Sequence, residues 1–173
     1  ALMTAPIKVM SFNVNGIRAR MHQLETVLEQ HRPDVIGLQE IKVSDEEFPI
    51  DAIIAMGYNV DFYGQKGHYG VALLSKIPAT NITRGYPTDA EDSQRRMIHG
   101  EYAFNGKTLH VINGYFPQGE SRKHPTKFPA KEKFYADLNV YIKGQFCNED
   151  RLIVMGDMNI AGADIDMKKR TWE

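Results

Sequence analysis

Polar side chains recur where the apolar, β-type segments of this sequence end. Four groups share that placement: Asn13 with Asn15, Glu40, Asn113 with Tyr115, and Asp157 with Asn159. Residues two apart in an extended strand face the same side, so the paired members of a group lie on one face. If the strands that carry these groups are neighbours in the fold, the side chains converge on one site.

A converging set of this kind would bind a hard cation. The carboxylates of Glu40 and Asp157, with the amide oxygens of Asn13 and Asn159, form an oxygen-rich set that suits Mg²⁺, or Mn²⁺, better than Zn²⁺. Such an ion polarises a phosphoryl oxygen and offsets the charge on a leaving oxygen, which indicates phosphodiester hydrolysis. Taken singly, however, Asn and Asp at strand ends usually cap helices or make turns.

The elements that would position these groups alternate between strands and helices. Val35 to Leu38 is a short apolar run typical of a strand buried on both faces, and it ends at Gln39 and Glu40. Helical spacing of apolar residues follows Met21 and recurs between Phe128 and Phe146. Further strands are expected at Ile7–Val14, Tyr58–Phe62, Tyr69–Ser75, Ile82–Tyr86, Met97–Phe104, Thr108–Tyr115 and Leu152–Met155. The pattern predicts a layered α/β architecture.

Composition bounds the class of protein. The 173 residues are 42% hydrophobic, enough for one sizeable core. The 22 acidic and 21 basic residues nearly cancel, so any surface for nucleic acid must be a local patch. The single cysteine, Cys147, excludes an intrachain disulfide and a multi-cysteine zinc cluster. No apolar run approaches the roughly 20 residues needed to cross a bilayer, and we expect a cytoplasmic protein with no membrane partner.

Five strings resemble exonuclease III, within the endonuclease/exonuclease/phosphatase superfamily: Ser11–Arg18, Gly37–Lys42, Gly64–Ala72, Asn113–Gly119 and Gly156–Asn159. They span nearly the whole chain in the family's order. The resemblance implies a four-layered α/β sandwich, with two packed mixed β-sheets flanked by helices. The family's C-terminal Ser-Asp-His motif does not occur in this sequence. We therefore expect residues 1–173 to be a single domain of this family that is incomplete at its C-terminus, with its C-terminal part missing.

The resemblance also implies roles for individual residues. Glu40, with Asn13 nearby, would hold magnesium against the scissile phosphate, and Tyr115 would contact that phosphate or its leaving oxygen. Asp157 would handle a proton or orient the attacking water, and Asn159 would stabilise the pentacovalent transition state. The candidate DNA contacts are Arg96, Gln118 and Lys127. Arg95 is a further guanidinium suited to phosphate oxygens.

The expected activity is Mg²⁺-dependent hydrolysis of DNA in base-excision repair, as a 3′–5′ exodeoxyribonuclease and an abasic-site endonuclease. The partners implied are double-stranded DNA, abasic sites and 3′ ends, and the full-length protein would be a monomer. Two alternatives stay open. One is another phosphodiesterase or phosphatase of the superfamily, and the other is a truncated, catalytically silent DNA-binding fragment.

Overall fold

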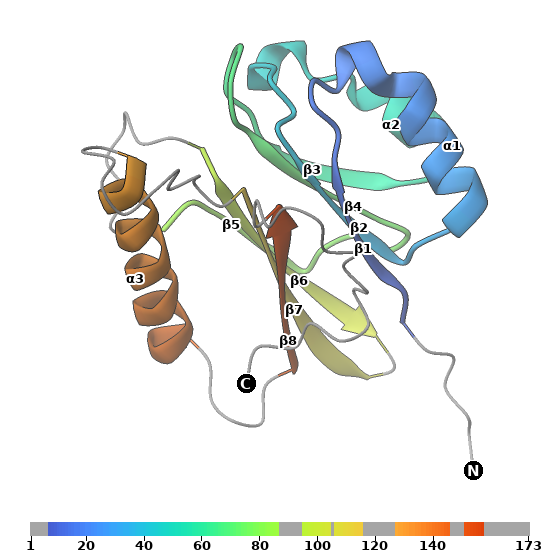
Figure 1. Cartoon of the computed structure of the whole chain (residues 1–173). Coiled ribbons are helices and arrows are strands. Elements are labelled where there is room, and N and C mark those ends of the chain that lie inside the picture. Colours follow the sequence, from blue (N-terminus) through green and yellow to red (C-terminus); the bar gives the residue numbers. More distant parts are fainter. Residues whose placement is uncertain (1–6, 87–94, 105, 116–126, 146–150, 158–173) are drawn as a thin grey trace.

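Two four-stranded sheets face each other, with helices on their outer faces. The computed structural model describes residues 7–86, 95–104, 106–115, 127–145 and 151–157 (Figure 1). One sheet has the order β1-β2-β4-β3, and its strands are β1 (Val9–Asn13), β2 (Val35–Gln39), β3 (Asn59–Tyr63) and β4 (Val71–Ser75). The other has the order β5-β6-β7-β8, and its strands are β5 (Asn81–Arg84), β6 (Met97–Phe104), β7 (Lys107–Tyr115) and β8 (Arg151–Asp157).

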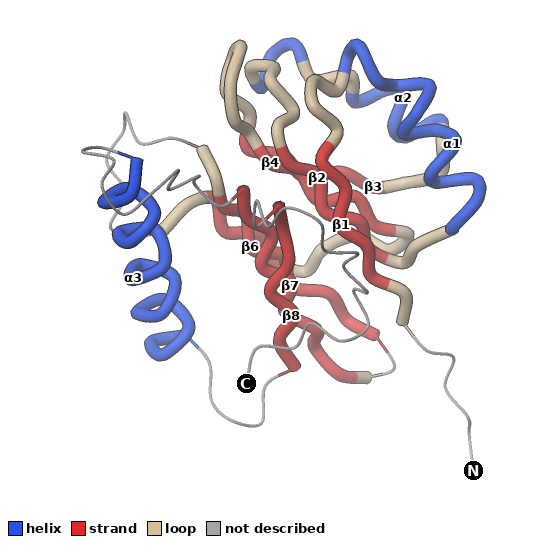
Figure 2. The backbone as a smooth tube through the Cα atoms, in the orientation of Figure 1, coloured by secondary structure: helices blue, strands red, loops and turns tan. Residues whose placement is uncertain are grey.

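The helices complete the outer layers. Figure 2 shows α1 (Met21–His31) and α2 (Ile50–Ala55) over the first sheet, and α3 (Lys127–Gln145) beside the second. Two short 3-10 helices, Arg18–Arg20 and Asp45–Glu47, precede α1 and α2. This arrangement confirms the predicted α/β sandwich with two mixed sheets flanked by helices. Along the part of the chain that the structure covers, no helix is both long and apolar enough to span a bilayer.

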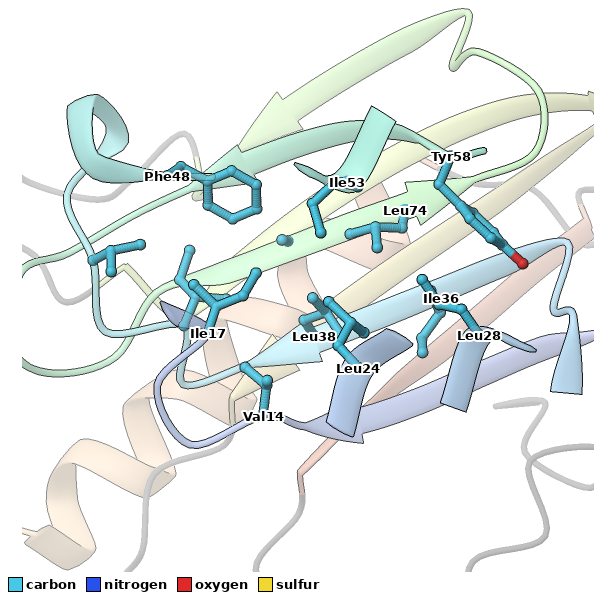
Figure 3. Packing of buried hydrophobic residues seen from close by; sticks show 13 residues of the cluster. Val14, Ile17, Leu24, Leu28, Ile36, Leu38, Phe48, Ile53, Tyr58 and Leu74 are labelled. Atoms are coloured by element: carbon cyan, nitrogen blue, oxygen red, sulfur yellow. The ribbon is translucent and has the colours of Figure 1, made fainter. Parts of the chain in front are cut away.

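The first outer layer is held by apolar side chains at helical spacing. Leu24 and Leu28 of α1 are buried against Ile36 and Leu38 of β2 in one cluster (Figure 3). Arg32, the residue after the helix, adopts a left-handed backbone (φ 46°) and donates its N–H to the carbonyl of Leu28. Pro33 follows, so the chain leaves the helix and enters β2.

The two sheets pack through a second apolar layer. Its buried members from the first sheet are Val35, Val71 and Leu73, and those from the second are Ile98, Tyr102, Leu109, Val111 and Met155. All five residues of β2 are buried, because this strand is covered by α1 on one face and by the second sheet on the other. The short apolar run in the sequence therefore has the environment that it predicts.

Two parallel strand pairs decide where the site lies. β1 and β2 are paired in parallel and connected by α1, and β7 and β8 are paired in parallel and connected by α3. Both members of each pair therefore end at the same edge of their sheet. β1 and β8 also approach each other across the two sheets. The carboxyl ends of four strands are thereby gathered at one end of the sandwich, which is where open α/β sheets usually bind their ligands.

A buried amide joins the sheets just behind this end. Asn113 of β7 is fully buried, and its Nδ2 donates to the backbone carbonyls of Leu38 (3.0 Å) and Ala72 (2.8 Å). Its Oδ1 accepts from Nε2 of Gln39 at 2.7 Å, and the same Nε2 lies 2.9 Å from Ser11 Oγ. Asn113 therefore acts as a cross-sheet connector, and its sequence-based grouping with Tyr115 at the candidate site stays a prediction.

Gly37 makes room for this connector. A Cβ at position 37 would lie 2.7 Å from Asn113 Cγ and 2.6 Å from Met155 Cε, closer than real Cβ contacts allow. The glycine thus lets the side chain of Asn113 reach β2. Without that space the amide could not bond across the layer.

Asn113→Ala should destabilise the protein by about 2–3 kcal/mol, because it removes three buried hydrogen bonds and leaves the Gln39 amide short of an acceptor. Urea unfolding monitored by circular dichroism measures this. The matched control is Asn59→Ala, since Asn59 is exposed and makes two longer bonds of 3.3 Å, and its cost should stay below about 0.5 kcal/mol. Equal costs for the two substitutions would contradict the connector role.

A histidine pair joins α3 to the outer face of the second sheet. Nδ1 of the buried His99 lies 2.5 Å from the Tyr141 hydroxyl on α3, and its Nε2 lies 3.1 Å from Nδ1 of His110. The Tyr141 hydroxyl can donate to Nδ1 only while the His99 imidazole is neutral. Burial, together with the neighbouring charge of His110, lowers the pKa of His99 to about 4, while Glu101 opposes this shift.

Folding stability should therefore rise with pH through His99. The unfolded chain takes up a proton near the usual pKa of 6.5 and the folded one only near 4, so the unfolded state binds more protons between these values. Stability should be lost as pH falls from about 6.5 to about 4, by roughly 3 kcal/mol at most. In His99→Gln the urea midpoint of unfolding should depend less on pH across this window than it does in the exposed control His31→Gln. Parallel curves for the two variants would refute the assignment.

Candidate active site

The structure brings Asn13 and Glu40 together at the shared end of β1 and β2. Asn13 is the last residue of β1 and is opposite Gln39, the last residue of β2, so Glu40 lies one residue beyond. The Gly16 N–H donates to the Glu40 carbonyl at 2.7 Å and holds the two turns side by side. Oδ1 of Asn13 accepts from the Asn15 N–H at 3.0 Å, which orients its amide. Both side chains are half-buried.

Backbone strain is concentrated here. Of the five described non-glycine residues in the left-handed region, four belong to this end of the fold: Asn15, Glu40, Lys42 and Tyr69, with φ between 46° and 59°. The Lys42 N–H donates to the Tyr69 carbonyl (3.0 Å), and its Nζ donates to Asn15 Oδ1 (2.6 Å). Such conformations persist only where the surroundings impose them, and they cluster at functional sites.

Arg96 and Tyr115 bring the second sheet into the same site. The Tyr115 N–H donates to the Arg96 carbonyl (2.7 Å), and Nη1 of Arg96 donates to the Tyr115 carbonyl (3.2 Å). The guanidinium carbon lies 4.3 Å from the ring centroid of Tyr69 and 4.9 Å from that of Tyr115. Burial lowers the pKa of Arg96, and Tyr69, Tyr115 and Glu40 oppose the shift. Arginine still carries its charge, so a cation lies within electrostatic reach of Glu40.

The adjacent arginine has a different task. Nη1 of Arg95 donates to the Gly64 carbonyl at 2.6 Å and lies 3.2 Å from Asp45 Oδ2, and its guanidinium covers the Tyr63 ring at 4.7 Å. Its backbone N–H donates to Gln65 Oε1 at 2.9 Å. Arg95 thus fastens the loop after β3, and its contacts are those of a structural residue.

The remaining predicted residues are placed only in part. Asp157 is the last residue of β8 and lies opposite Tyr115. Its backbone is therefore at the same edge of the second sheet as Tyr115. Its side chain, like that of Lys127 at the start of α3, lies outside the described parts of the structure. Gln118 and Asn159 also lie outside the described residues. Their proposed roles remain predictions.

Tyr69 is the site residue that sequence reasoning missed. The string Gly64–Ala72 carries it, but nothing in a linear sequence indicates that its ring meets an arginine 27 positions later. A left-handed, non-glycine residue is visible only in the structure. The neighbouring His68 is exposed, and its ring lies 5.9 Å from that of Tyr69, consistent with a surface histidine.

The donor set at this end fits a hydrated magnesium ion. Glu40 offers one half-exposed carboxylate and Asn13 one amide oxygen. Within the residues the structure describes, no group of three His, Cys, Asp or Glu could enclose a metal. Mg²⁺ commonly keeps several waters and takes one or two carboxylates together with substrate phosphates, so a single carboxylate in the described part suits it.

Comparison with known proteins identifies the family. The sequence profile of the endonuclease/exonuclease/phosphatase family matches residues 10–171, almost the whole chain. The chain belongs to this family. Exodeoxyribonuclease III of Haemophilus influenzae is 56% identical over 161 residues, which are 93% of this chain and 60% of that protein.

Solved structures of family members have the same fold. The 3′ phosphatase NExo from Neisseria, determined with a product DNA hairpin, superposes with a TM-score of 0.80 at 33% identity, over 92% of this chain and 60% of that one. An AP endonuclease from Archaeoglobus fulgidus gives 0.78 at 32% identity, over 93% and 60%. The chain therefore spans 60% of the length of each of these relatives.

Proposed function

We propose that this protein hydrolyses DNA phosphodiesters in base-excision repair, as a Mg²⁺-dependent 3′–5′ exodeoxyribonuclease and abasic-site endonuclease of the exonuclease III type. The observation that carries the proposal is that Arg96, which packs against Tyr115, lies within electrostatic reach of Glu40, which follows β2 beside the end of β1 at Asn13. A carboxylate suited to magnesium would then lie near a cation suited to phosphate. The identity to an exodeoxyribonuclease III and the DNA-bound state of NExo support DNA as the substrate.

Each residue then has a chemical task. Glu40, with Asn13, would hold magnesium, which supplies Lewis-acid polarisation of the phosphoryl oxygen. Arg96 would bind a non-bridging phosphate oxygen through its N–H donors, and Tyr115 would contact the phosphate or its leaving oxygen. Asp157 would orient the attacking water and accept its proton, with Asn159 stabilising the five-coordinate phosphorus. The P–O3′ bond breaks, the 3′ oxygen takes a proton, and the products are a 3′ hydroxyl and a 5′ phosphate.

The protein would act on abasic sites and 3′ ends of double-stranded DNA in the cytoplasm, as a monomer when full length. A lipid-directed or small-molecule phosphatase of the same family is less well supported, because the identity to a DNA exonuclease is high. Nicking assays that compare abasic duplex DNA with a phosphoinositide head group separate the two substrates. Salt-dependent binding to duplex DNA without nicking in Mg²⁺ or Mn²⁺ would favour the catalytically silent alternative.

Glu40→Gln should reduce Mg²⁺-dependent nicking of an abasic-site duplex on the order of 100-fold or more, because the amide is a poor ligand for magnesium in place of a carboxylate. The measurement is single-turnover cleavage, with metal affinity followed by titration calorimetry. Glu29→Gln on the exposed face of α1 is the matched control and should behave like the unsubstituted protein. Undiminished cleavage by Glu40→Gln would remove Glu40 from the site.

A further inference from the structure

Tyr69 occupies a backbone conformation that its residue type disfavours. Its φ of 59° is left-handed, which costs a residue with a Cβ about 1–2 kcal/mol relative to glycine. The flanking Gly67 and Gly70 also have positive φ, so the loop already uses glycine where it turns. The side chain of Tyr69 must therefore provide an interaction that offsets its unfavourable backbone.

The backbone around Tyr69 is bonded on both sides. Its carbonyl accepts from the Lys42 N–H (3.0 Å), and the next residue, Gly70, donates to the Arg95 carbonyl (2.9 Å) and accepts from the Ile41 N–H (3.2 Å). A Cβ at Gly70 would lie 2.6 Å from a side-chain carbon of Ile41, so this turn is tightly packed as well. The direction of the Tyr69 side chain is thus set by segments that also carry Glu40 and Arg96.

The Tyr69 ring meets both functional side chains of the second sheet. It lies 4.3 Å from the Arg96 guanidinium carbon, and its centroid is 6.3 Å from that of Tyr115. Arg96 lies 4.9 Å from the Tyr115 ring centroid, and the two rings are inclined at 44°, so the guanidinium is flanked by two tilted rings and not by parallel faces. Arg96 also hydrogen-bonds to the Tyr69 side chain. One face of the cation is covered, and its rotation is limited.

We propose that Tyr69 is a positioning residue that holds Arg96, and through it Tyr115, in place for the DNA phosphate. This inference rests on the proposed DNA hydrolysis. An arginine side chain carries considerable rotamer freedom, and it lies within electrostatic reach of the Glu40 carboxylate. The ring of Tyr69 holds the guanidinium in one orientation before the phosphate arrives, so less entropy is lost on binding.

The geometry of the neighbouring pair provides a matched control. Arg95 covers the Tyr63 ring at 4.7 Å, a contact of the same kind, but its guanidinium is engaged with Gly64 and Asp45. Loss of the Tyr63 ring should therefore leave phosphate binding unchanged. The two tyrosines separate a cation–π contact at the site from one that only fastens a loop.

The test measures the affinity of the protein for an abasic duplex as a function of salt concentration. The slope of log K (the association constant) against log salt is negative, and Tyr69→Leu should make it shallower by about 1, as expected for one lost phosphate contact. The same substitution should reduce kcat/KM about 3- to 30-fold. Tyr69→Phe, which keeps the ring and loses the hydroxyl, should lie between Tyr69→Leu and the unsubstituted protein. Tyr63→Leu should keep the full slope.

A purely structural role makes a different prediction, because fewer folded molecules lower the amplitude of binding and leave the slope intact. Tyr69→Asn guards against misfolding, since asparagine tolerates the left-handed backbone, and it should show the same reduced slope as Tyr69→Leu. An unaltered slope in either folded variant overturns the inference. If the unsubstituted protein neither binds nor cleaves DNA, it is the proposed function that fails.

Discussion

The hydrogen bond between Gln39 and Asn113 sets how the two sheets of this protein lie against each other. Apolar packing alone is not directional and would tolerate sliding of one sheet over the other. The buried amides of Gln39 and Asn113 bond at 2.7 Å, and Asn113 also binds two carbonyls of the first sheet. Any slip would leave these groups unsatisfied. Because Gln39 precedes Glu40 and Asn113 lies two residues before Tyr115, this connection also fixes the distance between the two halves of the site.

The second constraint is the charge balance at the carboxyl ends of the strands. Glu40 has the Arg96 cation within electrostatic reach, and the Lys42 ammonium group is held by Asn15. Cations beside Glu40, the proposed magnesium ligand, would suit a polyanionic substrate, because they attract phosphate and leave the carboxylate for the ion. Because the whole chain is nearly neutral, its composition could not predict this local arrangement of charges.

Much of the fold was predictable, and the reasons are local. The apolar run of β2 and the helical spacing in α1 each predict their own burial. The structure has Asn13 at the end of β1 and Glu40 directly after β2, as their positions at the ends of apolar segments predicted, and their roles stay predictions. What could not be predicted depends on pairing between the sheets. Asn113 looks in sequence like another strand-end polar residue, and only the facing Gly37 and Gln39 reveal it as a connector. Tyr69 was recognised as part of a string, but its contact with Arg96 arises from tertiary structure.

The glycine at position 37 limits which substitutions such a protein can accumulate during evolution. Its vacant volume is filled by Asn113 and Met155 from the opposite sheet, so an alanine at 37 is tolerated only if those neighbours have already become smaller or moved. A smaller residue at 113, introduced first, abandons the hydrogen bonds. Each single substitution is therefore disfavoured, whereas simultaneous substitutions are not. Positions 37, 39 and 113 should covary, with a substitution at one accompanied by substitutions at the others.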